Sequence, residues 1–157
     1  YFINLRIIEV GGFQYELVSE NPITKEKEEC IKMHVPKGAS LNEEDVRSSI
    51  RKSTYEIERY FNVKDINYYI ESWLLSPEVL ALLDDNSNIL KFSKLFSIKS
   101  MGECTRDILD FVFNDVYIKD YNLLVCKTSL QVKLKSLLIN KKEIHIGIGK
   151  LKQVDQI

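Results

Sequence analysis

Two runs of alternating apolar and polar residues, separated by a pair of glycines, are the strongest constraint on how this chain folds. The runs span residues 2–10 and 13–20, and both are rich in β-branched and aromatic side chains. Gly11 and Gly12 can adopt the positive φ angles that a tight hairpin turn requires. We therefore expect the chain to begin as two antiparallel strands joined at this turn.

A third strand and a long helix are predicted next. Residues 21–29 are polar and predict a loop, and residues 30–35 alternate again and predict a strand that ends at Pro36. Ser40 or Asn42 can cap a helix whose first turn is acidic and whose apolar residues continue at helical spacing to Phe61. The domain thus begins as a β-meander that leads into a helix.

The next strand carries the most distinctive residues. Residues 66–75 predict a strand that places Glu71 between Tyr69 and Trp73 on one face, and Ser76 followed by proline predicts a helix start. The later predicted helices are at 79–83, within 88–95 as a turn or two, at 105–113, and beyond the capping box of Thr128 and Gln131. The later predicted strands are at 96–101, 121–126 and 143–149.

The last predicted strand contains two glycines and one of the two histidines. His145 alternates with Gly147 and Gly149, which leaves room beside the strand for another backbone or for a ligand. Tight packing within the sheet explains the glycines equally well.

Composition limits the class of protein. The 157 residues, 45% of them hydrophobic, suit one domain with a packed core, and the net charge of −1 gives no general attraction to nucleic acid or to anionic membranes. Three widely spaced cysteines favour reduced thiols and predict neither a disulfide framework nor a metal site. No apolar run is long enough to span a membrane, so we expect a cytoplasmic protein.

The order of several short motifs resembles the C-terminal domain of GNAT-like acyltransferases. These motifs are His-Val-Pro-x-Gly at 34–38, Glu-Ser-Trp-Leu-Leu-Ser-Pro at 71–77, and Asn-Ser-Asn-Ile at 86–89 followed by Phe92. The resemblance covers nearly the whole chain and implies an α+β fold with a mixed, largely antiparallel sheet flanked by helices. It also implies one domain at 1–157 with an N-terminal region missing, because the chain opens at Tyr1 inside an alternating run.

The resemblance implies that acyl-CoA is the cosubstrate and lies where two neighbouring strands part. The cofactor-binding candidates are Val35, Lys37, Gly38, Ala39 and Ser40, which precede a helix start, together with Asn88, which could meet the pantetheine arm. The first group is also reasonable on physical grounds, because main-chain amides at a helix N-terminus attract anions. Asn88 could instead cap a turn.

Transfer of an acyl group to an amine requires a proton acceptor, and Glu71 is the catalytic candidate. The flanking aromatic residues Tyr69 and Trp73 could desolvate the carboxylate and raise its pKa. The resembled family has a histidine at this position, within Cys-His-Ser-Trp, and often an aspartate at the position of Ser76. Glu71 could equally be a solvated carboxylate or a member of an ion pair, and His34 could touch a ligand or be structural.

The sequence therefore leaves three hypotheses open. The first is an acyl-CoA-dependent N-acyltransferase that acts on a small-molecule amine. The second is a catalytically inactive binding or interaction module with the same fold. The third is a half-domain that completes a sheet with a missing N-terminal region or pairs its exposed edge with a second copy.

Overall fold

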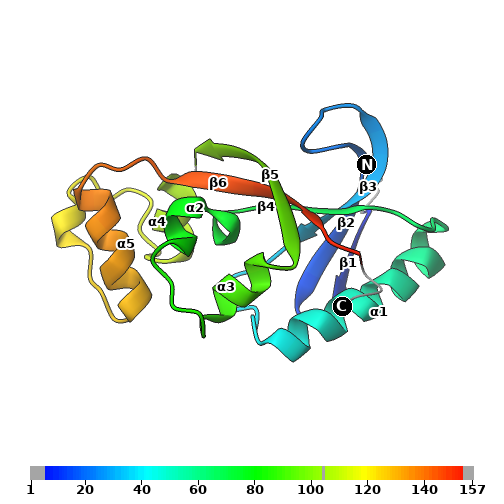
Figure 1. The fold of residues 1–157 in the computed structure, drawn as a ribbon, viewed down its shortest axis with the longest axis horizontal. Coiled ribbons are helices and arrows are strands. Elements are labelled where there is room, and N and C mark those ends of the chain that lie inside the picture. The colour runs from blue at the N-terminus through cyan, green and yellow to red at the C-terminus, as the bar shows by residue number, and fades with distance from the viewer. Residues whose placement is uncertain (1–5, 104, 154–157) are drawn as a thin grey trace.

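One six-stranded sheet forms the centre of the molecule, and helices flank it (Figure 1). The structure is a computed structural model that describes residues 6–103 and 105–153. The strand order is β1-β2-β3-β4-β6-β5, and only the pair β3 and β4 is parallel. The strands are β1 (Ile7–Val10), β2 (Phe13–Glu20), β3 (Lys27–His34), β4 (Tyr68–Ser72), β5 (Phe96–Glu103) and β6 (His145–Leu151). The α+β class with a mixed, largely antiparallel sheet is confirmed.

The helices lie between the strands in sequence. They are α1 (Glu43–Phe61), α2 (Pro77–Leu80), α3 (Asn88–Ser93), α4 (Thr105–Phe111) and α5 (Ser129–Ile139), with single 3-10 turns η1 (Trp73–Leu75) and η2 (Tyr121–Leu123). In Figure 1, α1 lies beside β1 and β2 at one end of the molecule, and α4 and α5 lie at the other end.

The predicted hairpin is confirmed. Gly11 and Gly12 have φ angles of 59° and 82°, and the register pairs Val10 with Phe13. The third strand begins at Lys27, earlier than predicted, because a bulge after Val18 lets Glu20 pair with Lys27. The loop between β2 and β3 is therefore shorter than the polar residues 21–29 predicted.

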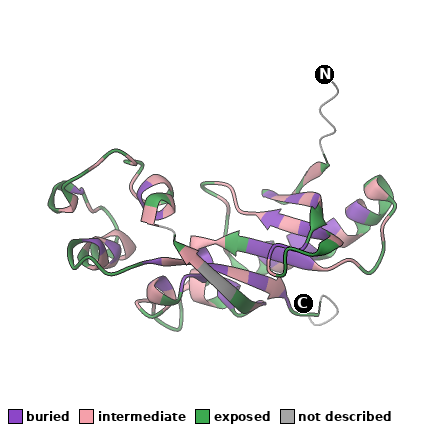
Figure 2. Ribbon diagram, turned by 90° about the horizontal axis from the view of Figure 1, so that it is seen from above, coloured by how far each residue is buried: buried purple, intermediate pink, exposed green. Residues whose placement is uncertain are grey.

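Helix α1 packs on the sheet through an apolar stripe with two serines inside it. Val46, Ile50 and Ile57 are buried against the strands, and each fully buried aliphatic side chain contributes about 1.5–3 kcal/mol. Ser49 donates a hydrogen bond to the Val10 carbonyl at 2.6 Å and accepts one from the hydroxyl of Tyr15 at 2.7 Å. Of the two predicted caps, Ser40 and Asn42, the structure has Asn42, whose side chain accepts a hydrogen bond from the amide of Glu44. Figure 2 shows buried residues on the strands and on the side of α1 that faces them.

A second apolar cluster forms at the opposite end, among α2, α4, α5 and η2. Its buried members are Val79, Ile108, Leu109, Leu124, Leu134, Leu138 and Ile144. Trp73 packs against both clusters, so this single side chain connects the two parts of the core. The predicted capping box of Thr128 and Gln131 is present at the start of α5.

Two predicted strands are wrong in part or entirely. The strand predicted at 66–75 ends at Ser72, whose hydroxyl accepts a hydrogen bond from the amide of Leu74 and so begins η1. The strand predicted at 121–126 does not form, because the side chain of Asp120 caps η2 instead. In both cases a short polar side chain satisfies the backbone locally and competes with strand pairing.

Leu75 of η1 packs directly on the backbone of β6. A Cβ atom added at Gly147 would lie 2.4 Å from both the Cβ and the carbonyl oxygen of Leu75, and one at Gly149 would lie 2.9 Å from a Leu75 methyl group. The room beside β6 is therefore filled by another stretch of backbone.

We expect Gly147→Ala to destabilise the protein by at least about 1–3 kcal/mol, because the added methyl group overlaps backbone that has no free space. The measurement is the urea midpoint of unfolding. Gly102→Ala on the neighbouring strand is the matched control, since its Cβ would lie 3.4 Å from a side-chain methyl group of Ile146. Equal stability of the Gly147 variant and the wild type would refute the packing argument.

Candidate functional site

The parallel strands β3 and β4 pair over only three residues and then separate. The last paired residues are Met33 and Ile70. Beyond them, β3 leads into Val35 and Pro36, whose ring nitrogen has no hydrogen to donate, while β4 turns into η1. A gap therefore opens beyond the carboxyl ends of two neighbouring strands, which is a usual place for ligands in sheets with parallel strands.

A cavity of about 270 Å³ occupies this gap. Four elements besides the two separating strands contribute to its walls: β2, η1, α4 and β6. The lining residues are Gln14, His34, Val35, Pro36, Ile70, Glu71, Ser72, Trp73, Asp107, Phe111 and Ile146. The cavity is therefore small, and both apolar and charged side chains line it.

Two pairs of side chains lie on the strands around the cavity. Glu71 lies 3.5 Å from the ammonium of Lys32, and each side chain is about one-third exposed, at 36% and 32%. His34 lies at the end of β3, and its Nε2 is 2.8 Å from a carboxylate oxygen of Glu16. Pairs this accessible contribute about 0–1 kcal/mol each, so they orient side chains more than they stabilise the fold.

A third carboxylate, Asp107, reaches the cavity from α4. Burial, together with the negative charges of Glu71 and Asp110, raises the pKa of Asp107, and Arg106 opposes this shift. Glu71 and Asp107 are therefore close enough to interact electrostatically. Sequence reasoning missed Asp107 and its neighbour Phe111, because nothing in the sequence of α4 shows which strands it packs against.

The loop after β3 is held by its own hydrogen bonds and by α4. Gly38 has a φ of 78°, and the amide of Ala39 donates to the Pro36 carbonyl at 3.1 Å. Lys37 donates to Asp110 at 2.6 Å and to Asn114 at 3.3 Å, and its ammonium lies over the ring of Phe111. The side chain of Lys37 thus fastens the loop to the helix that forms one wall of the cavity.

The structure brings only some of the predicted site residues together. Val35 and Glu71 line the cavity, and Lys37 contacts the outer side of its α4 wall. The hydroxyl of Ser40 donates to Asp45 at 2.7 Å inside the first turn of α1. Asn88 is the exposed first residue of α3 and does not line the cavity.

A family model described as the GNAT-like C-terminal domain matches residues 7–151. The chain belongs to this family. No curated protein matches the chain.

The GNAT-like fold is also found in solved acyltransferase structures. One, an acyltransferase in complex with decanoyl-CoA, has a TM-score of 0.79 and 21% identity over 92% of this chain and 45% of that chain. Another, in complex with decanoyl-CoA and teicoplanin, has a TM-score of 0.79 and 22% identity over 94% of this chain and 46% of that chain. The GNAT-like chain therefore spans less than half the length of these solved chains.

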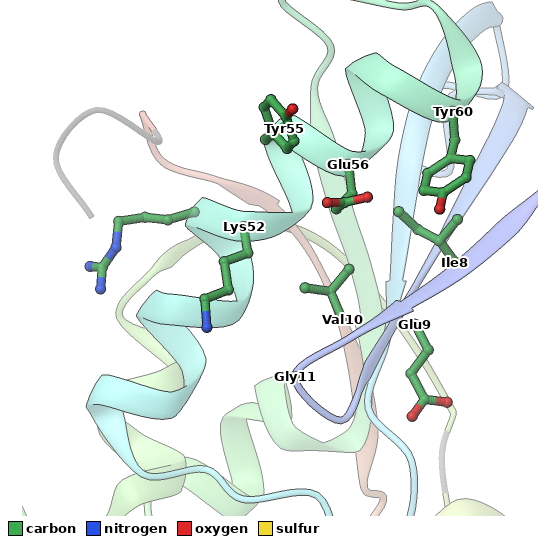
Figure 3. A pocket seen from close by; sticks show the side chains of 9 residues that line it. Ile8, Glu9, Val10, Gly11, Lys52, Tyr55, Glu56 and Tyr60 are labelled. Carbon is green, nitrogen blue, oxygen red and sulfur yellow. The ribbon is translucent and has the colours of Figure 1, made fainter.

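A second, larger groove of about 840 Å³ lies between β1 and α1 (Figure 3). Ile8 and Val10 from β1 and Tyr55 and Tyr60 from α1 provide its apolar surface, and the two tyrosines are 66% and 63% exposed. The groove lies along an edge strand of the GNAT-like sheet. No prediction from the sequence included it.

Neither of the two cysteines that the structure describes lines the cavity. Cys30 is buried, and burial followed by the charge of Glu28 raises the pKa of its thiol to about 11. Cys126 is a free thiol and Cys104 lies outside the described residues. Residues 6–103 and 105–153 contain no group of three or more potential metal ligands and no helix long and apolar enough to cross a membrane.

His145, the second histidine, is held by Glu78 at the start of β6. Its Nδ1 lies 2.6 Å from one carboxylate oxygen of Glu78, and its main-chain amide donates to the other at 3.0 Å. Burial alone would raise the pKa of Glu78, but hydrogen bonds from His145 and Ser76 lower it to about 2. The hydrogen bond with Glu78 raises the pKa of His145.

These opposite shifts predict how Glu78→Gln affects stability at different pH values. The carboxylate stabilises the fold above its ordinary pKa of 4.5 and loses this effect as the pH falls towards 2. The imidazolium stabilises the fold below its ordinary pKa of 6.5 and loses this effect as the pH rises through its raised value. Urea unfolding should therefore show the largest loss of stability between about pH 4.5 and 6.5.

Glu143→Gln is the control for this experiment, because Glu143 is 84% exposed and lies 3.4 Å from the same ring. A loss of stability in Glu78→Gln that is constant from pH 3 to pH 9 would contradict the ion-pair account.

Proposed function

We propose that this GNAT-like domain is the acyl-CoA-binding part of an N-acyltransferase that transfers an acetyl or other acyl group to a small-molecule amine. The observation that carries the proposal is the cavity between the separating ends of β3 and β4, which is lined by the carboxylates of Glu71 and Asp107 and by the start of the loop that leads to α1. Solved acyltransferases with this fold hold decanoyl-CoA or octanoyl-CoA, and one of them also holds teicoplanin. Because those chains are only 20–22% identical to this one, they support the fold and not the identity of the acceptor.

The phosphates of acyl-CoA would bind at the loop before α1. Val35, Lys37, Gly38, Ala39 and Ser40 are the proposed contacts, and α1 is a 19-residue helix whose N-terminal amides favour an anion. Nothing lies within 4 Å of a Cβ placed at Gly38, so a phosphate could approach the backbone there. Lys37 would exchange Asp110 for phosphate when the cosubstrate binds.

The remaining contacts are proposed for the pantetheine arm and for the amine. Asn88, exposed at the start of α3, is the proposed partner of the pantetheine amides. Glu71 is the proposed catalytic residue, in contact with the incoming amine inside the cavity. We place the reaction in the cytoplasm, where acyl-CoA is available.

We further propose that an N-terminal region of the same protein covers the groove between β1 and α1. The groove combines the apolar surface of Ile8, Val10, Tyr55 and Tyr60 with charged residues and follows the edge strand β1, and the solved acyltransferases are more than twice as long as this chain. A second copy of the chain that pairs along β1 is the alternative occupant.

A catalytically inactive binding module is the second candidate. Two observations favour it: the carboxylate of Glu71 is engaged by Lys32, and Ser76 hydrogen-bonds to Glu78 at 3.0 Å as the cap of α2. Such a module would bind acyl-CoA or a partner without turnover.

Calorimetric titration of the full chain with acetyl-CoA tests the binding site. We expect saturable binding, and at least tenfold weaker binding, or about 1.4 kcal/mol, for Gly38→Asp, which places a negative charge where the phosphate would lie. Gly38→Asn is the matched control with the same backbone constraint and no charge. S-acetylpantetheine, which lacks the phosphates, should bind equally to the wild type and to Gly38→Asp. No binding of acetyl-CoA by the folded protein would refute the proposal.

Glu71→Gln tests the catalytic role. We expect turnover, followed as release of the CoA thiol, to fall by at least tenfold at unchanged affinity for acetyl-CoA, because the amide removes the negative charge and keeps the shape. Glu29→Gln is the control, since Glu29 also lies on the sheet but pairs with Arg6 outside the cavity. An unchanged rate in Glu71→Gln would remove Glu71 from the mechanism.

A further inference from the structure

Resting on the proposed function, we infer that Asp107 of α4 is a second catalytic residue and that the acceptor is an aliphatic amine that arrives as an ammonium ion. In this arrangement Glu71 holds the ammonium and Asp107 takes its proton. Asp107 belongs to neither of the separating strands.

The geometry brings the two carboxylates into one cavity from different parts of the chain. Glu71 is the penultimate residue of β4, and Asp107 lies in the first turn of α4. Glu71 already has a cation, because Lys32 lies 3.5 Å away. Asp107 is half-buried and forms no ion pair or hydrogen bond with another described side chain. Of the two carboxylates, Asp107 is therefore the one still available to accept a proton.

The charges around Asp107 support this division of roles. Facing it are Glu71 from β4, Asp110 and Arg106 on its own helix, and His34 across the cavity at the end of β3. Burial contributes most to its raised pKa, and the two carboxylates contribute next. A carboxylate with a raised pKa is a better proton acceptor near neutral pH, and the negative charge of Asp107 also attracts a cation.

Helix α4 is held by Ile108 and Leu109 in the second apolar cluster and is joined to the loop after β3 by Lys37. Lys37 donates to Asp110 and Asn114, and its ammonium lies 5.4 Å from the centre of the Phe111 ring. These contacts join the loop after β3 to the helix that carries Asp107. Binding of phosphate at that loop would therefore change the contacts of α4, the helix that carries Asp107.

A primary ammonium loses one proton to the Asp107 carboxylate and becomes a neutral amine. The nitrogen lone pair attacks the thioester carbonyl carbon, a C–N bond forms, and the C–S bond breaks as the intermediate collapses. The second nitrogen proton ends on the CoA thiolate, so the products are an amide, free CoA and a protonated Asp107 that releases its proton to solvent.

The test compares Asp107→Asn and Glu71→Gln in the full chain, with acetyl-CoA and a panel of primary alkylamines and anilines. The readout is the pH dependence of kcat/KM measured by CoA release. Asp107→Asn should lower kcat by at least about 100-fold and abolish the acid limb. Glu71→Gln should raise KM for alkylamines more than for anilines and shift the acid limb to lower pH, because the charge of Glu71 raises the pKa of Asp107.

The opposite pattern would overturn the inference. If Glu71 were the proton acceptor, Glu71→Gln would abolish the acid limb and Asp107→Asn would only shift it. Asp115→Asn, an exposed carboxylate just after α4, is the control for loss of charge in this part of the chain.

A second measurement is independent of turnover. Titration of the Asp107 carboxyl carbon by NMR should show a lower midpoint in Glu71→Gln than in the wild type. An unchanged midpoint would refute the inference even where acyl transfer is observed. Failure to bind acetyl-CoA at all would refute the proposed function instead, so the two failures are distinguishable.

Discussion

The close packing of Leu75 against β6 is the constraint on which the arrangement of the candidate site depends. Gly147 and Gly149 leave no side chain on the face of β6 that meets Leu75, so η1 can lie directly on the strand. To reach this position the chain must leave β4 at Ser72, whose hydroxyl caps the turn. Since β3 continues past this point towards α1, the two parallel strands separate and the cavity opens between them.

Trp73 and Lys37 then connect this gap to the rest of the molecule. Trp73 packs against both apolar clusters and also lines the cavity, so the walls of the site are continuous with the core. Lys37 reaches α4 from the loop after β3 and holds a third wall in place. The strands thus provide one side of the site, and α4, which buries Ile108 and Leu109 in the second apolar cluster, provides the other.

The sequence predicted best the features that depend on a few neighbouring residues. The hairpin at Gly11 and Gly12, the cap at Asn42 and the capping box at Thr128 are all local, and all are present. The end of β4 and the absent strand at 121–126 were not predicted, because one depends on packing against β6 and the other on a competing cap at Asp120. The same limit applies to the site. The motif of β4 placed Glu71 in the cavity, whereas the arrival of Asp107 depends on how α4 docks.

The resemblance seen in the sequence implies a histidine where this chain has Glu71, and a carboxylate at that position would give the cavity different electrostatics on the same fold. A neutral imidazole at this position would favour an uncharged amine, whereas a carboxylate favours an ammonium ion and must then be accompanied by a second group that removes the proton. Lys32 on the neighbouring strand β3 forms an ion pair with Glu71, and Asp107 on α4 adds a negative charge. Because function depends on the charges and geometry of the site and not on the scaffold, this substitution would alter the choice of acceptor without any change in how the strands separate.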